Sequence, residues 1–478
     1  MEFIKEFLPI PYIGTSSSHF QSEPVMYAED GSILPPSSDW EYELSKNLAG
    51  LPSGIHDPQS LDELPHFLSI ADRYIARNRE LYQNMFCFSL EWGRLCRKPF
   101  EFDEKLMTEY VRVLAMARAA NQEPLLTLHH FTVPLYLAKV DAEGKIIEGG
   151  WEHPDVLKHF RFFASKVVDF LSDDAKMRTL LGNFGYGIEL QERFVEEGLC
   201  RHFITLNEPA IVALMGYVVG DFPPFKKSRV FGAKKVLETM AKAHDMAREE
   251  LQRLGVGKKP DRKPRVGVAH ACQYYDGVLG GLAERVSEYA VSVFEKDGTH
   301  SDFFGLHYYF RESLLPIMMR RKKLDFGDQP TFGDIFPLGI LRVLKKMSSL
   351  YPNKDIFISE IGFADTVGIR RPEWLAETIK YIMEARRDGL PIKAILFWSL
   401  VNNFEWNLGM RVAKFGMFSE KELLSPLPEK TDRVHSWQVW LRASRALRTP
   451  SDDTLAELEE VHELAEKKYQ DFKRSIAP

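Results

Sequence analysis

Residues 204–209 read ITLNEP, an apolar run that stops on a glutamate and a proline. Proline has no amide hydrogen to give to a sheet, and it disfavours helical geometry in the residue before it. We therefore expect a buried strand over residues 203–206 that ends in a rigid turn at Glu208. The stretch IFISEIG (356–362) has the same shape, and its strand ends on Glu360.

Either glutamate alone could as well cap a helix or pair with an arginine. Two carboxylates at strand ends, far apart in sequence, indicate a pair that the fold brings together. Paired carboxyl groups on either side of the scissile bond are what glycoside hydrolysis requires.

The composition of the 478 residues, 45% hydrophobic and 27% charged, is that of an ordinary globular protein. A net charge of −6 gives no support to nucleic-acid binding, which needs a basic face. The four cysteines have no metal-ligand spacing and predict free thiols in a reducing compartment. The short, charged N-terminus and the lack of an 18-residue apolar run predict a cytoplasmic protein without a membrane span or membrane partner.

Eight short apolar runs alternate with long amphipathic stretches. Such alternation indicates a parallel sheet covered by helices on both faces, and eight units fit a single (β/α)8 TIM barrel. A doubly wound sheet is the alternative, but YIGTSSSHF (12–20) lacks the glycine-rich phosphate turn typical of that fold. The expected strands lie in residues 10–18, 85–92, 124–131, 202–209, 264–274, 301–309, 355–362 and 394–403.

Polar and aromatic residues gather where these predicted strands end. In a barrel all the strand ends open on one face, where active sites lie. Each residue alone is better explained as structural, so the prediction of a site depends on their convergence. They are Gln21, Trp92, Arg94, His129, His130, Asn207, Glu208, Tyr308, Tyr309, Glu360, Trp398 and Glu405.

Two segments exceed a minimal barrel. Residues 171–200, with GNFGYG at their centre, are expected to form a loop between two helical turns, outside the barrel on the amino-terminal side of the strands. Residues 451–476 carry one apolar stripe at helical spacing and predict a helix on the barrel's outside, capped by Asp452 or Asp453, or else a partner-binding helix. We expect one catalytic domain over residues 1–478, with 446–478 as a C-terminal helical extension.

The motifs, taken together, resemble glycoside hydrolase family 1, the β-glucosidase and β-galactosidase family. ITLNEP is similar to its acid/base motif and FISEIG (357–362) to its nucleophile motif; FWSLVNNFEWNLG (397–409) and LTLHHFTVP (126–134) are similar to its last-strand and third-strand motifs. The resemblance runs in order from about residue 9 to about residue 445, and LEWGR (90–94) looks nearer the archaeal-type branch.

The resemblance implies a retaining β-glycosidase that hydrolyses β-linked glucosides or galactosides in two steps, without a metal or organic cofactor. Glu360 would be the nucleophile, held ionised by Arg94 and Tyr309. Glu208 would be the acid/base, with a pKa raised by burial and by Glu360. The glycon would be bound by Gln21, His130, Asn207, Trp398, Glu405 and Trp406.

The chain departs from the family pattern at several positions. Thr132 stands where an aspartate is usual, His307 replaces an asparagine, Asn402 replaces an aspartate, and Ile361 replaces the asparagine after the nucleophile. None of these changes removes a catalytic group.

Three other readings stay open. A 6-phospho-β-glycosidase would carry serine and lysine where Glu405 stands, and a carboxylate there would repel a phosphate dianion, although Arg411 and Lys414 lie nearby in sequence. A non-catalytic sugar-binding relative would be expected to lose a carboxylate. A transglycosidase cannot be separated from a hydrolase by sequence. The expected partner is a small β-glycoside, and the sequence allows a homo-oligomer.

Overall fold

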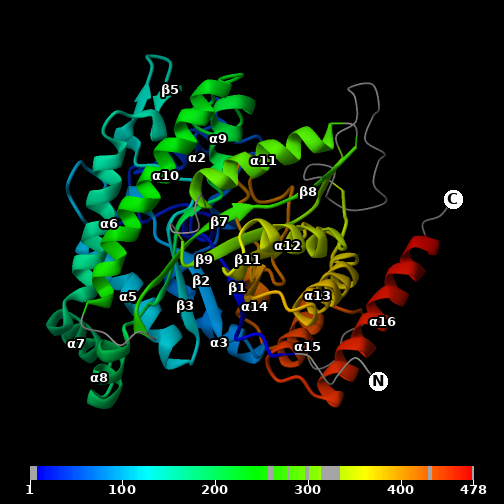
Figure 1. Ribbon diagram of the computed structural model, residues 1–478. Helices are drawn as coiled ribbons and strands as arrows, with labels where there is room; N and C mark the ends of the chain where they lie inside the picture. The colour runs from blue at the N-terminus through cyan, green and yellow to red at the C-terminus, as the bar shows by residue number, and fades with distance from the viewer. Residues whose placement is uncertain are drawn as a thin grey trace.

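The computed structural model describes residues 8–256, 262–277, 279–295, 301–313, 334–428 and 433–475. Eight parallel strands close into a barrel in the order β1-β12-β11-β9-β7-β6-β3-β2, which confirms the predicted (β/α)8 fold (Figure 1). All eight expected runs supply a barrel strand. The strands are β1 Tyr12–Ser16, β2 Met85–Ser89, β3 Glu123–His129, β6 His202–Asn207, β7 Arg265–Ala271, β9 Phe303–Tyr308, β11 Asp355–Gly362 and β12 Ile392–Trp398.

Side chains from inside the strands fill the barrel, so it is a packed core and not a pore. At its centre the rings of Phe303 and Phe357 stack with centroids 4.2 Å apart. Alternate strand residues such as Phe86 and Phe88 belong instead to the larger core between strands and helices. Burial on both faces explains why the strands read as continuous apolar runs. The interior cluster consists of Met85, Cys87, Leu125, Ile204, Ala269, Phe303, Phe357, Ala394 and Leu396.

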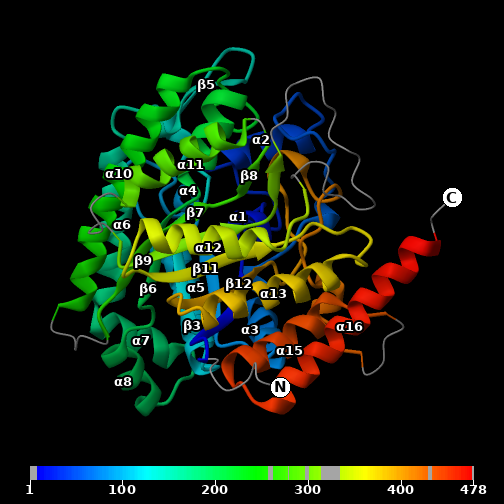
Figure 2. The same cartoon turned by 45° about the vertical axis from the view of Figure 1, so that its right-hand side comes forward.

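Helices surround the strands, as the two views show (Figures 1 and 2). Their starts follow local capping rules: the Asp103 side chain, for example, accepts a 2.9 Å hydrogen bond from the amide of Leu106 at the start of α5. The longer helices of this layer are α3 Ala71–Glu80, α5 Glu104–Ala119, α6 Val156–Ser172, α10 Val230–Gln252, α11 Gly280–Glu295, α12 Gly339–Leu350, α13 Arg371–Arg387 and α15 Ser436–Arg448.

Shorter elements follow the strand ends. They are α1 His19–Ser22, α2 Asp39–Leu48, α4 Trp92–Leu95, α9 Pro209–Leu214, α14 Glu420–Leu423, a hairpin of β4 Ala138–Val140 and β5 Ile146–Gly149, and a pair of β8 Tyr274–Asp276 and β10 Arg311–Ser313.

The segment before the fourth barrel strand forms two complete helices, α7 Asp174–Asn183 and α8 Ile188–Glu197, where the sequence predicted only helical turns. Its predicted position is confirmed. The Arg118 guanidinium pairs both with Glu123, which begins β3, and with Glu197, which ends α8. The pair of helices therefore lies at the amino-terminal end of the strands (Figure 1, lower left).

Helix α16, Asp452–Ser475, packs against α13 and α15 on the outside of the barrel, as predicted. Its apolar stripe is buried there through Leu458, Val461, Ala465 and Tyr469. The predicted aspartate cap is wrong: Ser451 caps the helix, because its hydroxyl accepts a 3.2 Å hydrogen bond from the amide of Thr454. Within the described part of the chain, no helix has the length and apolar character needed to cross a membrane.

Candidate active site

Glu208 stands in a strained turn at the carboxyl end of β6. Its backbone is left-handed, with φ 43° and ψ 57°, and its amide donates a 2.8 Å hydrogen bond to the carbonyl of Ala269. A residue with a β-carbon rarely adopts this conformation, which is typical of functional sites. Pro209 begins α9 directly afterwards, so the turn is fixed from both sides.

Glu360 lies on a bulge of β11. The register with β9 shifts between Ile358 and Glu360, and the register with β12 shifts between Ile358 and Ile361. A bulge re-aims the side chain that it carries. The Ser16 hydroxyl donates a 2.5 Å hydrogen bond to the carbonyl of Ser359 and so ties the bulge to the opposite neighbour of β12.

His307 joins the two carboxylates. It lies opposite Glu360 in the β9–β11 register, and its Nδ1 is 2.9 Å from Oε1 of Glu208 and 3.2 Å from Oε2 of Glu360. The three side chains place their donor atoms within 4.8 Å of one another. The nearest carboxylate oxygens of Glu208 and Glu360 are therefore no more than 4.8 Å apart.

The electrostatics of the three groups are linked. Burial raises the pKa of Glu360 to about 7, helped by Glu208, while His307 and the Tyr309 hydroxyl favour the ionised carboxylate. Burial lowers the pKa of His307, but Glu360 and Glu208 outweigh it and leave that pKa above its ordinary value. Tyr309 donates a 2.5 Å hydrogen bond to Oε2 of Glu360, as the sequence predicted.

Arg94 does not support Glu360, and that prediction is wrong. Its buried guanidinium bonds instead to Glu41 at 2.6 Å, to Nε2 of His19 at 3.2 Å and to the carbonyl of Glu23 at 2.6 Å. Glu41, on α2, is the carboxylate that pairs with this cation, and each of the three guanidinium nitrogens makes one of these contacts. Arg94 therefore stabilises the packing behind the site.

His307 is the functional candidate that sequence reasoning missed. Among the described residues it is the one basic side chain with a nitrogen within 4.0 Å of Glu360. Burial raises the pKa of the Cys87 thiol to about 12, and the charge of Glu360 contributes to this rise. A neutral thiol gives no charge, so His307 supplies the cation. In the sequence, the clue to the role of His307 was that it replaces the asparagine usual in the family.

Three predicted glycon-binding residues meet around His130. The amide of Asn207 lies 3.2 Å from Nε2 of His130, and the imidazole stacks near Trp398 with centroids 5.6 Å apart. Trp406 is parallel to His130 at 5.9 Å and also stacks on Phe20 at 5.6 Å. Burial holds the pKa of His130 well below its ordinary value, so its imidazole is neutral.

Gln21 and Glu405 form a second polar pair. The Gln21 amide donates to Oε2 of Glu405 at 3.2 Å and to the carbonyl of Phe404 at 2.9 Å. Burial raises the pKa of Glu405 to about 8, with further contributions from Glu360 and Glu208. The charges of Glu360 and Glu208 therefore act on Glu405.

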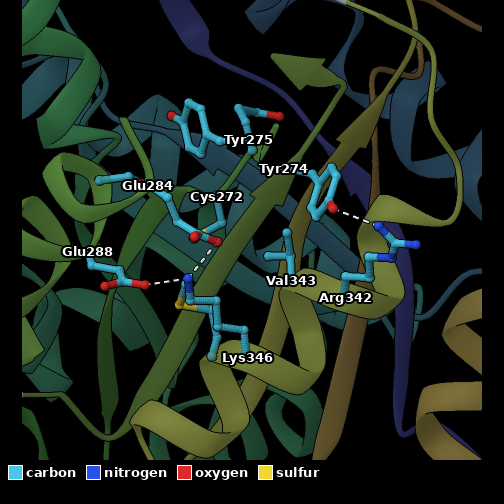
Figure 3. Close-up of a pocket in the computed structure, with 11 residues that line it drawn as sticks. Cys272, Tyr274, Tyr275, Glu284, Glu288, Arg342, Val343 and Lys346 are labelled. Atoms are coloured by element: carbon cyan, nitrogen blue, oxygen red, sulfur yellow. Dashed lines mark hydrogen bonds and ion pairs between the residues drawn. The ribbon is translucent and has the colours of Figure 1, made fainter. Parts of the chain in front are cut away.

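A cavity of about 140 Å³ lies beside the site between α11, α12 and β8 (Figure 3). Gln273 in its wall accepts 3.1 Å hydrogen bonds from the amides of Tyr309 and Phe310, so this wall holds the backbone of Tyr309. Lys346 of α12 bridges Glu284 and Glu288 of α11. These two salt bridges tie α11 to α12.

Comparison with known proteins agrees with the barrel fold. The chain is 24% identical over 427 residues to a chloroplastic galactolipid galactosyltransferase of Arabidopsis thaliana, covering 84% of this chain but only 59% of that protein. It is 21% identical over 478 residues to β-glucosidase 47 of the same plant, covering 87% of this chain and 81% of the relative. The structure superimposes on a β-glycosidase from Pyrococcus horikoshii with a TM-score of 0.67 and 22% identity, over 95% and 98% of the two chains.

The family model described as glycosyl hydrolase family 1 matches residues 67–278 and 319–422. These stretches include Glu208 and Glu360, together with the barrel strands that carry them, whereas His307 lies between the two stretches. The chain therefore belongs to glycosyl hydrolase family 1.

Proposed function

We propose that the protein is a retaining β-glycosidase that acts on β-linked glucosides or galactosides through a glycosyl ester of Glu360. The observation that carries this proposal is the pair of strand-end carboxylates, Glu208 and Glu360, whose oxygens share Nδ1 of His307 at 2.9 and 3.2 Å. Short spacing leaves no room for a water between carboxylate and sugar, so direct attack by a carboxylate is favoured.

In the first step an ionised Glu360 attacks the anomeric carbon, and the bond to the leaving oxygen breaks. Glu208 gives its proton to that oxygen. Glu360 is then a neutral ester and Glu208 a carboxylate, so the negative charge has moved from one glutamate to the other. His307 is within hydrogen-bond distance of both, and its proton can follow that charge without a change of rotamer.

In the second step Glu208 takes a proton from water, and the resulting hydroxide attacks the anomeric carbon. The ester bond breaks, Glu360 regains its charge and Glu208 holds a proton again. Two displacements on opposite faces give net retention. Asn207, His130, Gln21 and Glu405 hold the glycon, with Trp398 against its apolar face.

The favoured glycon is not phosphorylated. Glu405 brings no positive charge to the site, and its ionised form would repel a phosphate dianion. Arg411, which could have offset it, pairs with Glu63 at 3.0 Å and with Asp57 at 3.7 Å. Hydrolysis and transfer to another alcohol share the same first step, and the relative named a galactolipid galactosyltransferase makes transfer the second candidate. Four free cysteines fit a reducing, cytoplasmic location.

Chemical rescue tests the two assignments separately. Glu360→Ala is expected to lose activity, and added azide should restore turnover with an inverted product, because the anion fills the vacated space. Glu208→Ala should show a burst of aglycone from substrates with good leaving groups, followed by slow turnover that azide accelerates with retention. The same product anomer from both variants would refute the assignment. Nitrophenyl glycosides with and without a 6-phosphate identify the glycon.

A further inference from the structure

A group of large apolar side chains is exposed on the rim of the barrel beyond Glu208. On α10 the exposed fractions are 63% for Val230 and 91% for Phe231; on α11 they are 64% for Leu282 and 61% for Val286. A soluble surface seldom exposes so many bulky apolar residues together. We name as the rim patch Leu214, Val230, Phe231, Leu282, Val286 and Tyr289.

The patch is continuous across three helices. Leu282, Val286 and Tyr289 are spaced so that they share one face of α11. The ammonium of Lys234, one turn after Phe231 on α10, lies over the Tyr289 ring at 5.9 Å. Both views place α9, the start of α10 and α11 side by side at the end of the barrel opposite to α7 and α8 (Figures 1 and 2).

Salt bridges to a neighbouring helix hold α11 in this orientation. Glu284 and Glu288 are half-buried, and both bind Lys346 of α12 (Figure 3). The buried apolar residues of α11 are Ala290, Val291 and Phe294, so the face with Leu282 and Val286 is a second apolar face, and it is exposed.

Cations flank the α10 part of the rim patch although the whole chain has a net charge of −6. Residues 226–235 read KKSRVFGAKK, so Val230 and Phe231 stand between two basic clusters. Lys227, Arg229 and Lys235 are exposed. Lys226 is bound by Glu152, and Lys234 has only a long 3.9 Å contact with Glu238. Bulky apolar side chains framed by lysine and arginine are typical of surfaces that lie in the headgroup region of an anionic membrane.

We propose that the rim patch docks this protein onto an anionic lipid bilayer, with Phe231 inserted among the headgroups and the surrounding lysines on lipid phosphates. Docking would place the rim of the barrel, and with it Glu208, at the membrane surface. The proposal departs from the expectation of no membrane partner, which considered only spanning helices. The docking itself does not depend on the proposed function. Only the inference that glycosides carried by membrane lipids are substrates rests on the proposed function.

The test is flotation of the full chain with vesicles of phosphatidylcholine alone, or of seven parts phosphatidylcholine to three parts phosphatidylglycerol. The protein should float with the anionic vesicles and be released as salt rises from about 0.1 M to about 0.5 M. Phe231→Ser and the double variant Lys234→Glu, Lys235→Glu should each lower the bound fraction about tenfold or more. Ile188→Ser is the matched control, since Ile188 is 76% exposed on α8, at the other end of the barrel.

Hydrolysis of soluble nitrophenyl glycosides should be unchanged in Phe231→Ser, and unchanged thermal unfolding would show that the variant is folded. Failure of the wild-type protein to float, or equal flotation of Phe231→Ser, would overturn the proposal. A concentration-dependent dimer that Phe231→Ser abolishes, without vesicle binding, would also overturn it and assign the patch to self-association. Vesicle binding that persists in a protein inactive on every glycoside would refute the proposed function and leave the docking intact.

Discussion

Replacing His307 with asparagine removes the cation between the two glutamates and restores the residue usual in the family. Asparagine can still donate a hydrogen bond, so the variant isolates the charge. In the wild type Nδ1 lies 3.2 Å from Oε2 of Glu360, and the pKa of Glu360 is about 7 even with this partner. Without it, the pKa of Glu360 should rise further.

The size of the rise follows from the distance. Opposite unit charges about 3–4 Å apart attract by about 4–5 kcal/mol at an effective dielectric constant of about 20. One pKa unit corresponds to about 1.4 kcal/mol, so the upper limit is about 3.5 units. The cation is shared with Glu208, and Tyr309 keeps its hydrogen bond to Glu360. We therefore expect a rise of about 1–2 units.

The assay is the pH profile of kcat/KM on a nitrophenyl glycoside. The nucleophile must be ionised, so the acidic limb of His307→Asn should move upward by about 1–2 units, and activity at pH 6 should fall about 10- to 100-fold. His270→Asn is the matched control, because His270 is also buried and lies 3.2 Å from Glu295, outside the site. It should lower stability without moving the limb. If the acidic limb of His307→Asn stays where it is in the wild type, His307 does not favour the ionised form of Glu360.

Three further predictions concern other charged groups. Glu405→Ser should lower kcat/KM on unphosphorylated glycosides about 100-fold or more, because it removes a polar partner of the glycon. A wild-type enzyme that is active only on 6-phospho substrates would contradict the role of Glu405. Burial raises the pKa of Glu373 to about 7, and the nearby charge of Glu466 contributes. The folded state therefore holds the Glu373 proton more tightly than the unfolded state does, and stability falls as pH rises from about 4.5 to about 7. Glu373→Gln should therefore stabilise the protein by about 1–2 kcal/mol at pH 8 and hardly at pH 4.5, as measured by denaturant unfolding. An equal stabilisation at the two pH values would contradict the raised pKa of Glu373. Arg94→Met should cost about 3–5 kcal/mol of stability, since it leaves Glu41 buried without its cation. The acidic limb of the pH profile of kcat/KM should stay in place. A shifted limb would show that Arg94 does support the ionised nucleophile.

The barrel could be predicted from sequence because its signals are local. Each strand is apolar on both faces, and the proline after Glu208 marks the turn at which β6 ends. The bulge of β11 that re-aims Glu360 left no such signal, because a register shift depends on the neighbouring strands. The helices α7 and α8 were underestimated since their centre is rich in glycine.

The charge pattern of the site was the part that sequence reasoning assigned wrongly. Arg94 is close to the end of β2 in sequence, but its choice of Glu41 depends on how α2 folds across that end. His307 was visible as a departure, yet its contact with both glutamates requires knowing that it faces Glu360 across β9 and β11. Distances between strand ends are set by barrel closure, which no local pattern encodes.

In the proposed mechanism Glu360 forms the covalent bond to the sugar. A 2-deoxy-2-fluoroglucosyl fluoride, or the galactosyl compound, should inactivate the enzyme because the slow second step lets the ester accumulate. Peptide mass spectrometry of the inactivated protein should find one added fluorosugar, on the peptide that contains Glu360, with His307→Asn labelled more slowly at pH 6 than the wild type. A label on Glu208 or on any other residue, or full inactivation without a label, would contradict the account.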